Sequence, residues 1–102
     1  MKYGLSDTVI HELQNVFRSQ PGIEKVLIFG SRAKGCQREG SDIDLAVVSP
    51  TLTPKQLLAL STAIDDLDLL YRIDLLDYNK HVGTPIGQHI DRVGQVFYQA
   101  EH

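Results

Sequence analysis

The sequence predicts an α+β fold, in which a small mixed β-sheet of about three strands is covered by helices in the order αβαβαβα. Two patterns indicate this fold class: helical periodicity and short apolar runs alternate along the chain, and prolines and glycines separate them. The length of 102 residues is a third indication, because it suits one core and leaves no room for a second of ordinary size. We therefore expect residues 1–102 to form a single domain.

The first half of the chain predicts one helix and two strands. The helix begins after Ser6 or Asp7, either of which suits an N-cap, and ends before Pro21. Residues 26–29 are apolar on both faces, and so is the apolar half of residues 43–48, as in strands that are covered on both sides of a sheet. The helix is defined by apolar residues at three- and four-residue spacing, namely Val9, Ile10, Leu13, Val16 and Phe17.

The second half predicts two helices on either side of a third strand. Thr53-Pro54 and Thr84-Pro85 each combine an N-cap residue with proline at the first helical position, a frequent helix start. We expect the earlier of these helices to run to about Leu70 and the later one to include Phe97. Residues 72–78 form a short apolar run with acidic residues inside it, which indicates a strand.

Composition excludes several classes of protein. With 10 basic and 13 acidic residues the net charge is -3, which argues against strong nonspecific binding to nucleic acid. The single cysteine, Cys36, excludes an intramolecular disulfide and a cysteine-cluster metal site, and the four histidines lack ligand spacing. We find no signal peptide and no apolar run long enough to span a membrane, so we expect a cytoplasmic protein.

Asp42 and Asp44 begin the second predicted strand. Side chains two residues apart on a strand point to the same face, so the two carboxylates should be neighbours. Like charges this close repel each other unless a cation lies between them. Magnesium prefers oxygen ligands and is commonly held by one or two carboxylates together with substrate phosphates. A lone Asp-x-Asp is more often a solvated strand end than a metal site.

Asp74 is a third acidic residue, set in the apolar run of the third predicted strand. If the second and third strands are adjacent, Asp74 completes a cluster that could hold one or two magnesium ions about 4 Å apart. We expect its carboxylate also to take the proton from an attacking hydroxyl. Three acidic residues on two strands favour a catalytic site over solvation or capping.

Gly30 and Ser31 follow the first predicted strand directly. Glycine lets the backbone approach a ligand closely, and backbone N–H groups at the start of a short helix bind anions such as phosphate. Arg32 and Lys34 add positive charge to the same turn, and with Gly30 and Ser31 they are our candidate nucleotide-binding residues. The alternative is a plain turn with solvated cations. The combination of this glycine turn with a carboxylate pair favours a metal and triphosphate site.

Gly30-Ser31, ten further residues and then Asp42-Ile43-Asp44, with Asp74 downstream, resemble the signature of the DNA polymerase β-type nucleotidyltransferases. The chain is most similar to the minimal nucleotidyltransferases (MNT) that pair with HEPN-domain proteins in bacteria and archaea. The resemblance covers nearly the whole chain. It implies the nucleotidyltransferase fold, metal binding by the three aspartates and triphosphate binding at Gly30 and Ser31. Relatives frequently carry arginine where this chain has Lys34.

The resemblance also implies an activity and a partner. Members transfer a nucleoside monophosphate, often AMP from ATP, to a hydroxyl, and an MNT protein acts as antitoxin by adenylylating a tyrosine of its HEPN toxin. Two alternatives stay open: an inactive nucleotide-binding module that neutralises its partner by contact, and transfer to a small molecule or tRNA. Because the chain has no acceptor-binding domain, we expect a complex with a HEPN protein or with a second copy. Candidate contact residues are Leu69, Leu70, Phe97 and Tyr98.

Overall fold

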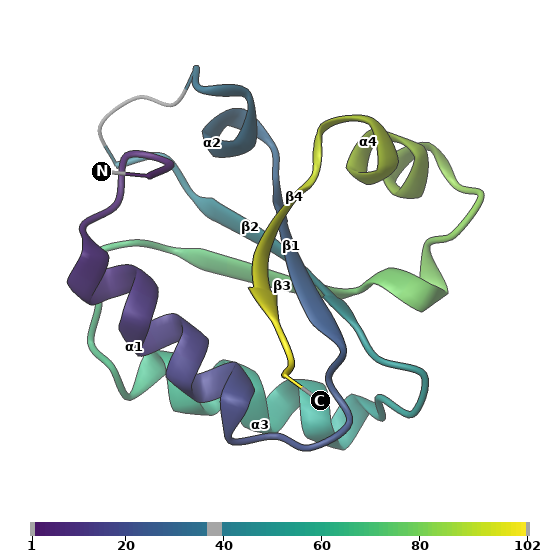
Figure 1. The fold of residues 1–102 in the computed structure, drawn as a ribbon, viewed down its shortest axis with the longest axis horizontal. Helices are drawn as coiled ribbons and strands as arrows, with labels where there is room; N and C mark the ends of the chain where they lie inside the picture. Colours follow the sequence, from purple (N-terminus) through teal and green to yellow (C-terminus); the bar gives the residue numbers. More distant parts are fainter. Residues whose placement is uncertain (1, 37–39, 102) are drawn as a thin grey trace.

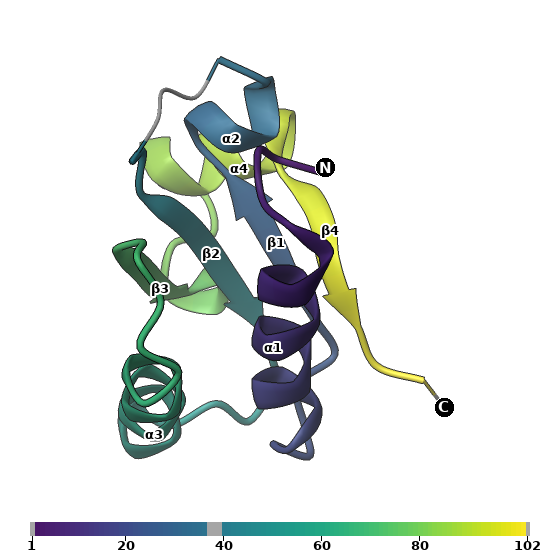
Figure 2. The same cartoon turned by 90° about the vertical axis from the view of Figure 1, so that its left-hand side faces the viewer.

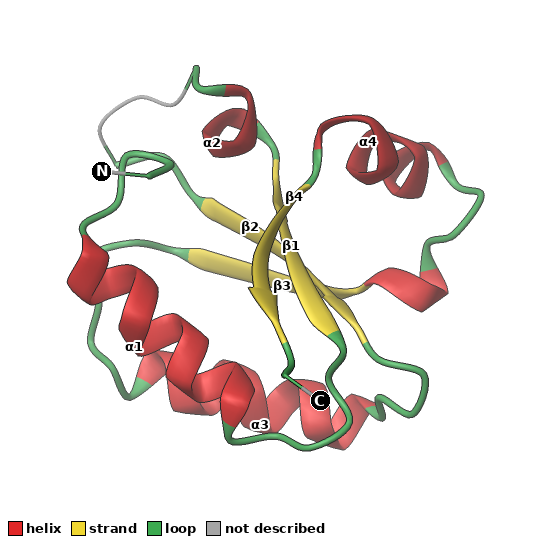
Figure 3. Ribbon diagram, in the orientation of Figure 1, coloured by secondary structure: helices red, strands yellow, loops and turns green. Residues whose placement is uncertain are grey.

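The computed structural model describes residues 2–36 and 40–101, which form an α+β structure, so the expected fold class is confirmed (Figures 1 and 3). Helices and strands alternate along most of this part of the chain, as the sequence patterns predict. The elements are α1 (Asp7–Arg18), β1 (Lys25–Phe29), α2 (Ser31–Lys34), β2 (Ile43–Val48), α3 (Pro54–Asp65), β3 (Ile73–Asp77), the 3-10 helix η1 (Tyr78–Lys80), α4 (Pro85–Val93) and β4 (Gln95–Gln99).

The four strands form one mixed sheet in the order β3-β2-β1-β4, which can be followed in Figure 2. Strand β1 pairs antiparallel with both β2 and β4. Strand β3 pairs parallel with β2, and α3 makes the crossover between them. The expected adjacency of the second and third strands is therefore confirmed, and the carboxyl end of β1 meets the amino ends of β2 and β3 at one end of the sheet.

The fourth strand, β4, corrects the expectation of about three strands. We expected the last helix to include Phe97, but α4 ends at Val93 and Phe97 lies in β4. Gly94 caps α4 with an extended backbone, and its N–H donates to the carbonyl of Ile90. The apolar spacing of four, three and four residues continues across this glycine by coincidence, because Phe97 packs from a strand into the cluster of α1 and α3, whereas Ile90 of α4 packs into a second cluster.

Helix α3 is shorter than the sequence predicted. It begins at the expected place, where Thr53 and Gln56 form a capping box. It ends at Asp65 rather than near Leu70, because the acidic segment after it makes tight turns in which Asp68 adopts a positive φ of 55°. Leu70 therefore lies in the connection to β3 and not on a helix.

Helices cover both faces of the sheet (Figure 2). In that view α1 lies in front of the sheet and α4 behind it. Alternate residues of β2 divide between the two faces: Ile43, Leu45 and Val47 pack against α1 and α3, whereas Ala46 packs with Phe29 and with Ile90 of α4. Since Asp44 has the same parity as Ala46, its side chain belongs to the α4 face.

Within residues 2–36 and 40–101, no helix is both long enough and apolar enough to cross a membrane.

Candidate nucleotide and metal site

Two of the predicted metal ligands lie opposite each other on neighbouring strands. In the parallel pairing of β2 with β3, Asp44 is the partner of Asp74. Paired residues on adjacent strands point to the same face, so both carboxylates lie on the α4 face of the sheet. Asp42 is exposed and lies just before β2 begins at Ile43, at the same end of the sheet. The structure thus places the three acidic residues at the same end of the sheet.

Electrostatics confirms that the carboxylates lie close enough to affect one another. Burial, and then the charges of Asp74 and Asp42, raise the pKa of Asp44 above its ordinary value of 3.8. The charge of His89 acts in the opposite direction and lowers the pKa of Asp44. Negative charge is therefore concentrated around Asp44, and a bound cation would relieve the repulsion between the carboxylates.

Gly30 connects the phosphate-type turn to this carboxylate. Its predecessor, Phe29, pairs with Asp44 across β1 and β2, so the turn begins beside the acidic residue. Gly30 has a φ of 77° and a ψ of -154°, a conformation that side-chain-bearing residues rarely adopt. A Cβ built on Gly30 would overlap Oδ2 of Asp44. Only glycine fits here, because the backbone passes so close to the carboxylate.

Ser31 is the first residue of α2, and Gly30 is the N-cap of that helix. The first backbone N–H groups of a helix have no acceptor within the helix, so they are available to an anion. The side chain of Ser31 is half-buried and stands at the same turn. Together these groups can bind phosphate oxygens next to the carboxylate cluster.

The side chains as they stand suit magnesium in chemistry but are not closed around a single point. Within the described part of the chain, no three His, Cys, Asp and Glu side chains are arranged to hold a metal ion. One carboxylate oxygen of Asp74 lies 3.5 Å from Nε of Arg72 in an ion pair. The donors are carboxylate oxygens, the type that magnesium prefers, and rotation of exposed Asp42 and Asp74 toward Asp44 would complete the set.

The structure gives Arg32 another place than the nucleotide site that we expected. Its side chain is 3% exposed, and its guanidinium donates to the backbone carbonyls of Ser41 and Tyr3 and lies over the ring of Tyr71. These contacts turn its donors away from the Gly30 and Ser31 amides. Arg32 and Ala33 are the buried residues of α2, whereas Ser31 is half-buried. Lys34 is exposed, beside a shallow hollow that Lys2 and Tyr3 also line.

His89 is a candidate site residue that the sequence did not reveal. It lies on α4, is half-buried, and its ring meets the ring of Phe29 edge-on at a centroid distance of 6.4 Å. Its effect on the pKa of Asp44 places it at the same cluster. The spacing of α4 put His89 on a helix but gave no sign that this helix would cover the acidic residues, because that depends on the path of the chain after β3.

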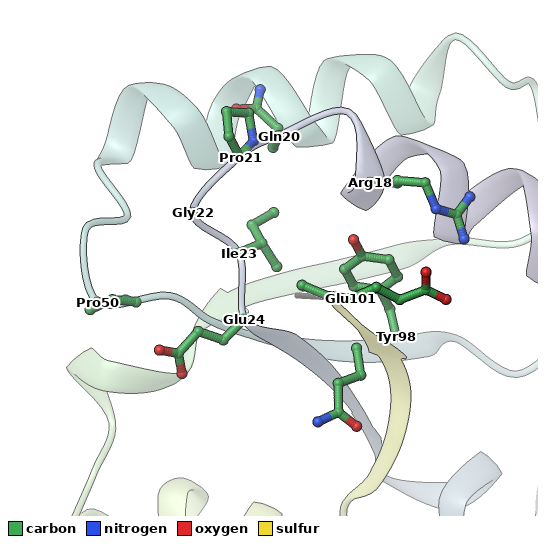
Figure 4. A pocket seen from close by; sticks show the side chains of 11 residues that line it. Arg18, Gln20, Pro21, Gly22, Ile23, Glu24, Pro50, Tyr98 and Glu101 are labelled. Carbon is green, nitrogen blue, oxygen red and sulfur yellow. The ribbon is translucent and has the colours of Figure 1, made fainter.

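A cavity of about 550 Å³ opens at the opposite end of the sheet (Figure 4). It lies before β1 begins and after β2 and β4 end, where Arg18 stacks over the ring of Tyr98 at 5.9 Å. Its lining includes the separate acidic residues Glu24 and Glu101 but no paired carboxylates and no phosphate-type turn. The cluster around Asp44, rather than this cavity, therefore has the chemistry of a nucleotide site.

The fold and the site together define a nucleotidyltransferase. Residues 11–102 match the family described as polymerase beta, nucleotidyltransferase, and the chain belongs to that family. The expected family is thereby confirmed, and so are the mixed sheet and the helices that it implied.

The chain is also similar to individual proteins of known sequence or structure. Over 56 residues, 52% of this chain, the sequence is 45% identical to a protein of Haemophilus influenzae named probable protein adenylyltransferase MntA, and the match spans 47% of that relative's length. A crystal structure described as a toxin-antitoxin with AMP-PNP is 26% identical, with a TM-score of 0.68 over 95% of this chain and 76% of its own.

A second similar structure supports the fold alone. It is the tri-AMPylated Shewanella oneidensis HEPN toxin in complex with MNT antitoxin, with a TM-score of 0.67 and 21% identity. The match covers 94% of this chain and 74% of the other. The sheet and helices around the candidate site are therefore shared with these chains.

Proposed function

We propose that this chain is a magnesium-dependent adenylyltransferase that transfers AMP from ATP to a hydroxyl of a protein acceptor. The observation that carries the proposal is the register that sets Asp44 opposite Asp74, with Gly30 beside Asp44. This arrangement joins a carboxylate cluster to an anion-binding turn. The adenylyltransferase name of the Haemophilus influenzae relative and the AMP-PNP in the similar toxin-antitoxin structure support the choice of ATP.

The chain's own residues have separate tasks in this reaction. The amides that follow Gly30 and the hydroxyl of Ser31 bind the triphosphate, and Asp42, Asp44 and Asp74 would hold magnesium. Magnesium, when bound, neutralises phosphate charge and aligns the reacting oxygens. A carboxylate oxygen of Asp74 takes the proton of the acceptor hydroxyl. The hydroxyl oxygen bonds to the α-phosphorus, the bond to the bridging oxygen breaks, and pyrophosphate leaves.

The acceptor that we propose is a tyrosine of a HEPN-type toxin, with this chain as the antitoxin in the cytoplasm. The similar structure with AMP-PNP is a toxin-antitoxin, which supports a partner of this class. The site lies at the end of the sheet where β1 ends and β2 and β3 begin, and Asp42 and Asp74 are exposed there. A complex would supply an acceptor-binding surface.

One experiment tests this activity. The chain is incubated with a HEPN-type protein, labelled ATP and Mg²⁺, and transfer is followed by mass spectrometry of the acceptor. We expect a gain of one AMP group for the native chain, no gain for Asp44→Asn, and a normal gain for the matched control Asp66→Asn. Asp66 is an exposed residue at the end of α3, outside the site. Equal labelling by native chain and Asp44→Asn contradicts the proposal.

A second candidate function is neutralisation by contact without transfer. The ion pair between Arg72 and Asp74 favours it, because it occupies the carboxylate that should act as the base. In that case the toxin is inhibited equally with and without ATP, and Asp44→Asn inhibits as well as the native chain. Under the first proposal inhibition needs ATP, and it persists after the two proteins are separated.

A further inference from the structure

We infer that Arg32 is a positioning residue that holds the phosphate-binding turn and the catalytic carboxylates in a fixed arrangement; this rests on the proposed function. The guanidinium does not bind the substrate in this role. It acts through the backbone carbonyls of Ser41 and Tyr3 and through the ring of Tyr71.

The contacts of Arg32 are numerous for one side chain. Its Nε and Nη2 donate to the carbonyl of Ser41 at 3.1 and 2.8 Å, and its Nη1 donates to the carbonyl of Tyr3 at 2.8 Å. The guanidinium carbon lies 5.0 Å from the centre of the Tyr71 ring. All three guanidinium nitrogens are therefore used, and the fork that could have bound a phosphate binds Ser41 instead.

Two of the three partners, Ser41 and Tyr71, precede acidic residues of the site in the sequence. Arg32 itself follows Ser31 of the phosphate-binding turn, and Ser41 precedes Asp42. Tyr71 stands shortly before Asp74. One buried side chain thus connects the phosphate-binding turn with the residues that precede Asp42 and Asp74, and these three segments are distant in the sequence.

The sheet alone does not fix these approaches. Strand β2 begins at Ile43, so Asp42 and Ser41 lie beyond the end of the β-ladder, and β3 begins at Ile73, after Tyr71. The ladder positions Asp44 and Asp74, whereas the backbone before Asp42 receives two hydrogen bonds from Arg32. Arg32 therefore supplies a constraint where the hydrogen bonds between strands have ended.

Burial makes this constraint stiff. Among the described residues no carboxylate pairs with Arg32, so its charge is stabilised by carbonyl dipoles and by the Tyr71 ring. Moving the guanidinium out of place would break its hydrogen bonds to Ser41 and Tyr3 and leave a buried charge without these partners. Lysine cannot replace it fully, because an ammonium lacks the planar fork that reaches Ser41 and Tyr3 together.

The test compares Arg32→Lys and Arg32→Gln with the matched control Arg18→Lys. Arg18 also stacks over a tyrosine, Tyr98, but at the far end of the sheet. All rates are measured well below each variant's melting temperature and per folded molecule. We expect kcat to fall about 10- to 100-fold in the Arg32 variants, since small misplacements of reacting groups have effects of this size. The KM for ATP should stay within about twofold of the native value.

The ring of Tyr71 provides a second, milder pair of variants. Tyr71→Phe keeps the aromatic face and should behave as the native chain, whereas Tyr71→Leu should lower kcat with KM for ATP retained. This pair decides the matter if the Arg32 variants do not fold. An unchanged kcat per folded molecule overturns the inference, and so does a rise in KM for ATP with kcat unchanged, which would mean a direct phosphate contact.

Binding of Mn²⁺, measured by electron paramagnetic resonance, separates this inference from the proposed activity. If the native chain transfers no AMP, the proposed function fails, but the arrangement of the carboxylates is still tested. We expect Arg32→Lys and Tyr71→Leu to bind Mn²⁺ several-fold more weakly than the native chain and Arg18→Lys. Equal affinities in all four proteins overturn the positioning role.

Discussion

At the scale of single residues, Asp44 is stressed by its surroundings. Burial and the nearby carboxylates of Asp74 and Asp42 disfavour its charged form and raise its pKa, and a bound cation would favour the charged form again. The same proximity explains Gly30, whose missing side chain leaves room for the Asp44 carboxylate. Function at this site is therefore expected to oppose stability.

Asp44→Asn should stabilise the metal-free chain while it abolishes transfer. The pKa of Asp44 is raised in the folded state, so the folded chain binds its proton more tightly than the unfolded chain. Stability then falls as pH rises from about 4 through the folded pKa, and the amide removes this loss. Because the group is partly exposed, we expect a melting temperature only about 1–3 °C higher at pH 7 in EDTA. Calorimetry that finds no increase, or the same pH dependence in both proteins, contradicts this.

Gly30→Ala should abolish transfer, and Gly35→Ala provides its control. Both glycines have a positive φ, of 77° and 76°, but a Cβ at Gly35 meets no atom within 4 Å. Gly35→Ala should lose about 1 kcal/mol of stability from its left-handed backbone, and Gly30→Ala about 1–3 kcal/mol, because a ψ of -154° at positive φ is essentially restricted to glycine; both are measured by urea unfolding. Only Gly30→Ala adds a clash with Asp44, so it alone should lose at least about 100-fold in transfer. Equal activities would mean that the close approach does not matter.

At the scale of elements, the sequence predicted those segments whose signals are local. Capping residues identified the starts of α1, α3 and α4, and the glycine after β1 identified the turn that carries Ser31. The sequence also identified Asp74 as an acidic residue in an apolar strand. It could not specify that this strand pairs parallel with β2 in a register opposite Asp44, since that depends on the α3 crossover.

Strand β4 was missed although a local signal existed. Gln95–Gln99 contains a valine and two aromatic residues in succession after a glycine, a pattern that favours a strand over a helix. The contacts of Arg32 and His89 had no comparable signal. Both depend on backbone or rings from distant segments, which no spacing along the chain encodes.

Strand β4 predicts that substitutions at two neighbouring residues change the free energy of unfolding by unequal amounts. Val96 is 50% exposed and Phe97 is 4% exposed. Val96→Thr should change the free energy of unfolding by less than about 0.5 kcal/mol. Phe97→Leu should lower it by about 1–2 kcal/mol, because it removes buried ring atoms from the core. Urea unfolding that ranks the two variants the other way would contradict the assignment.

At the scale of the whole molecule, the candidate nucleotide site and the cavity of about 550 Å³ lie at opposite ends of the sheet. Of the contact residues that we expected, Phe97 and Tyr98 are buried, so they are unsuited to a partner surface. Leu69 packs partly against the core, whereas Leu70 is 99% exposed in the segment that leads from α3 to β3. Leu70 is thus the one of the four that can reach another chain, and it lies on the approach to Asp74.

Leu70→Ser should weaken the interaction with the acceptor protein and leave ATP binding unchanged. Exposed leucines at an interface lose apolar burial when replaced by serine, and we expect about a five- to tenfold weaker Kd, measured by calorimetry. Leu58→Ser is the control, since Leu58 is also exposed but lies on α3. Equal affinity of the Leu70→Ser and native chains would exclude Leu70 from the interface.

The parallel pairing of β2 with β3 has a consequence for how freely this sequence can diverge. Hydrogen bonds between main chains hold neighbouring strands about 4.8 Å apart, whatever side chains surround them. The spacing of the two facing aspartates is consequently inherited from the peptide ladder itself. A chain that is only 26% identical can therefore keep the same distance between neighbouring strands although most of its side chains differ.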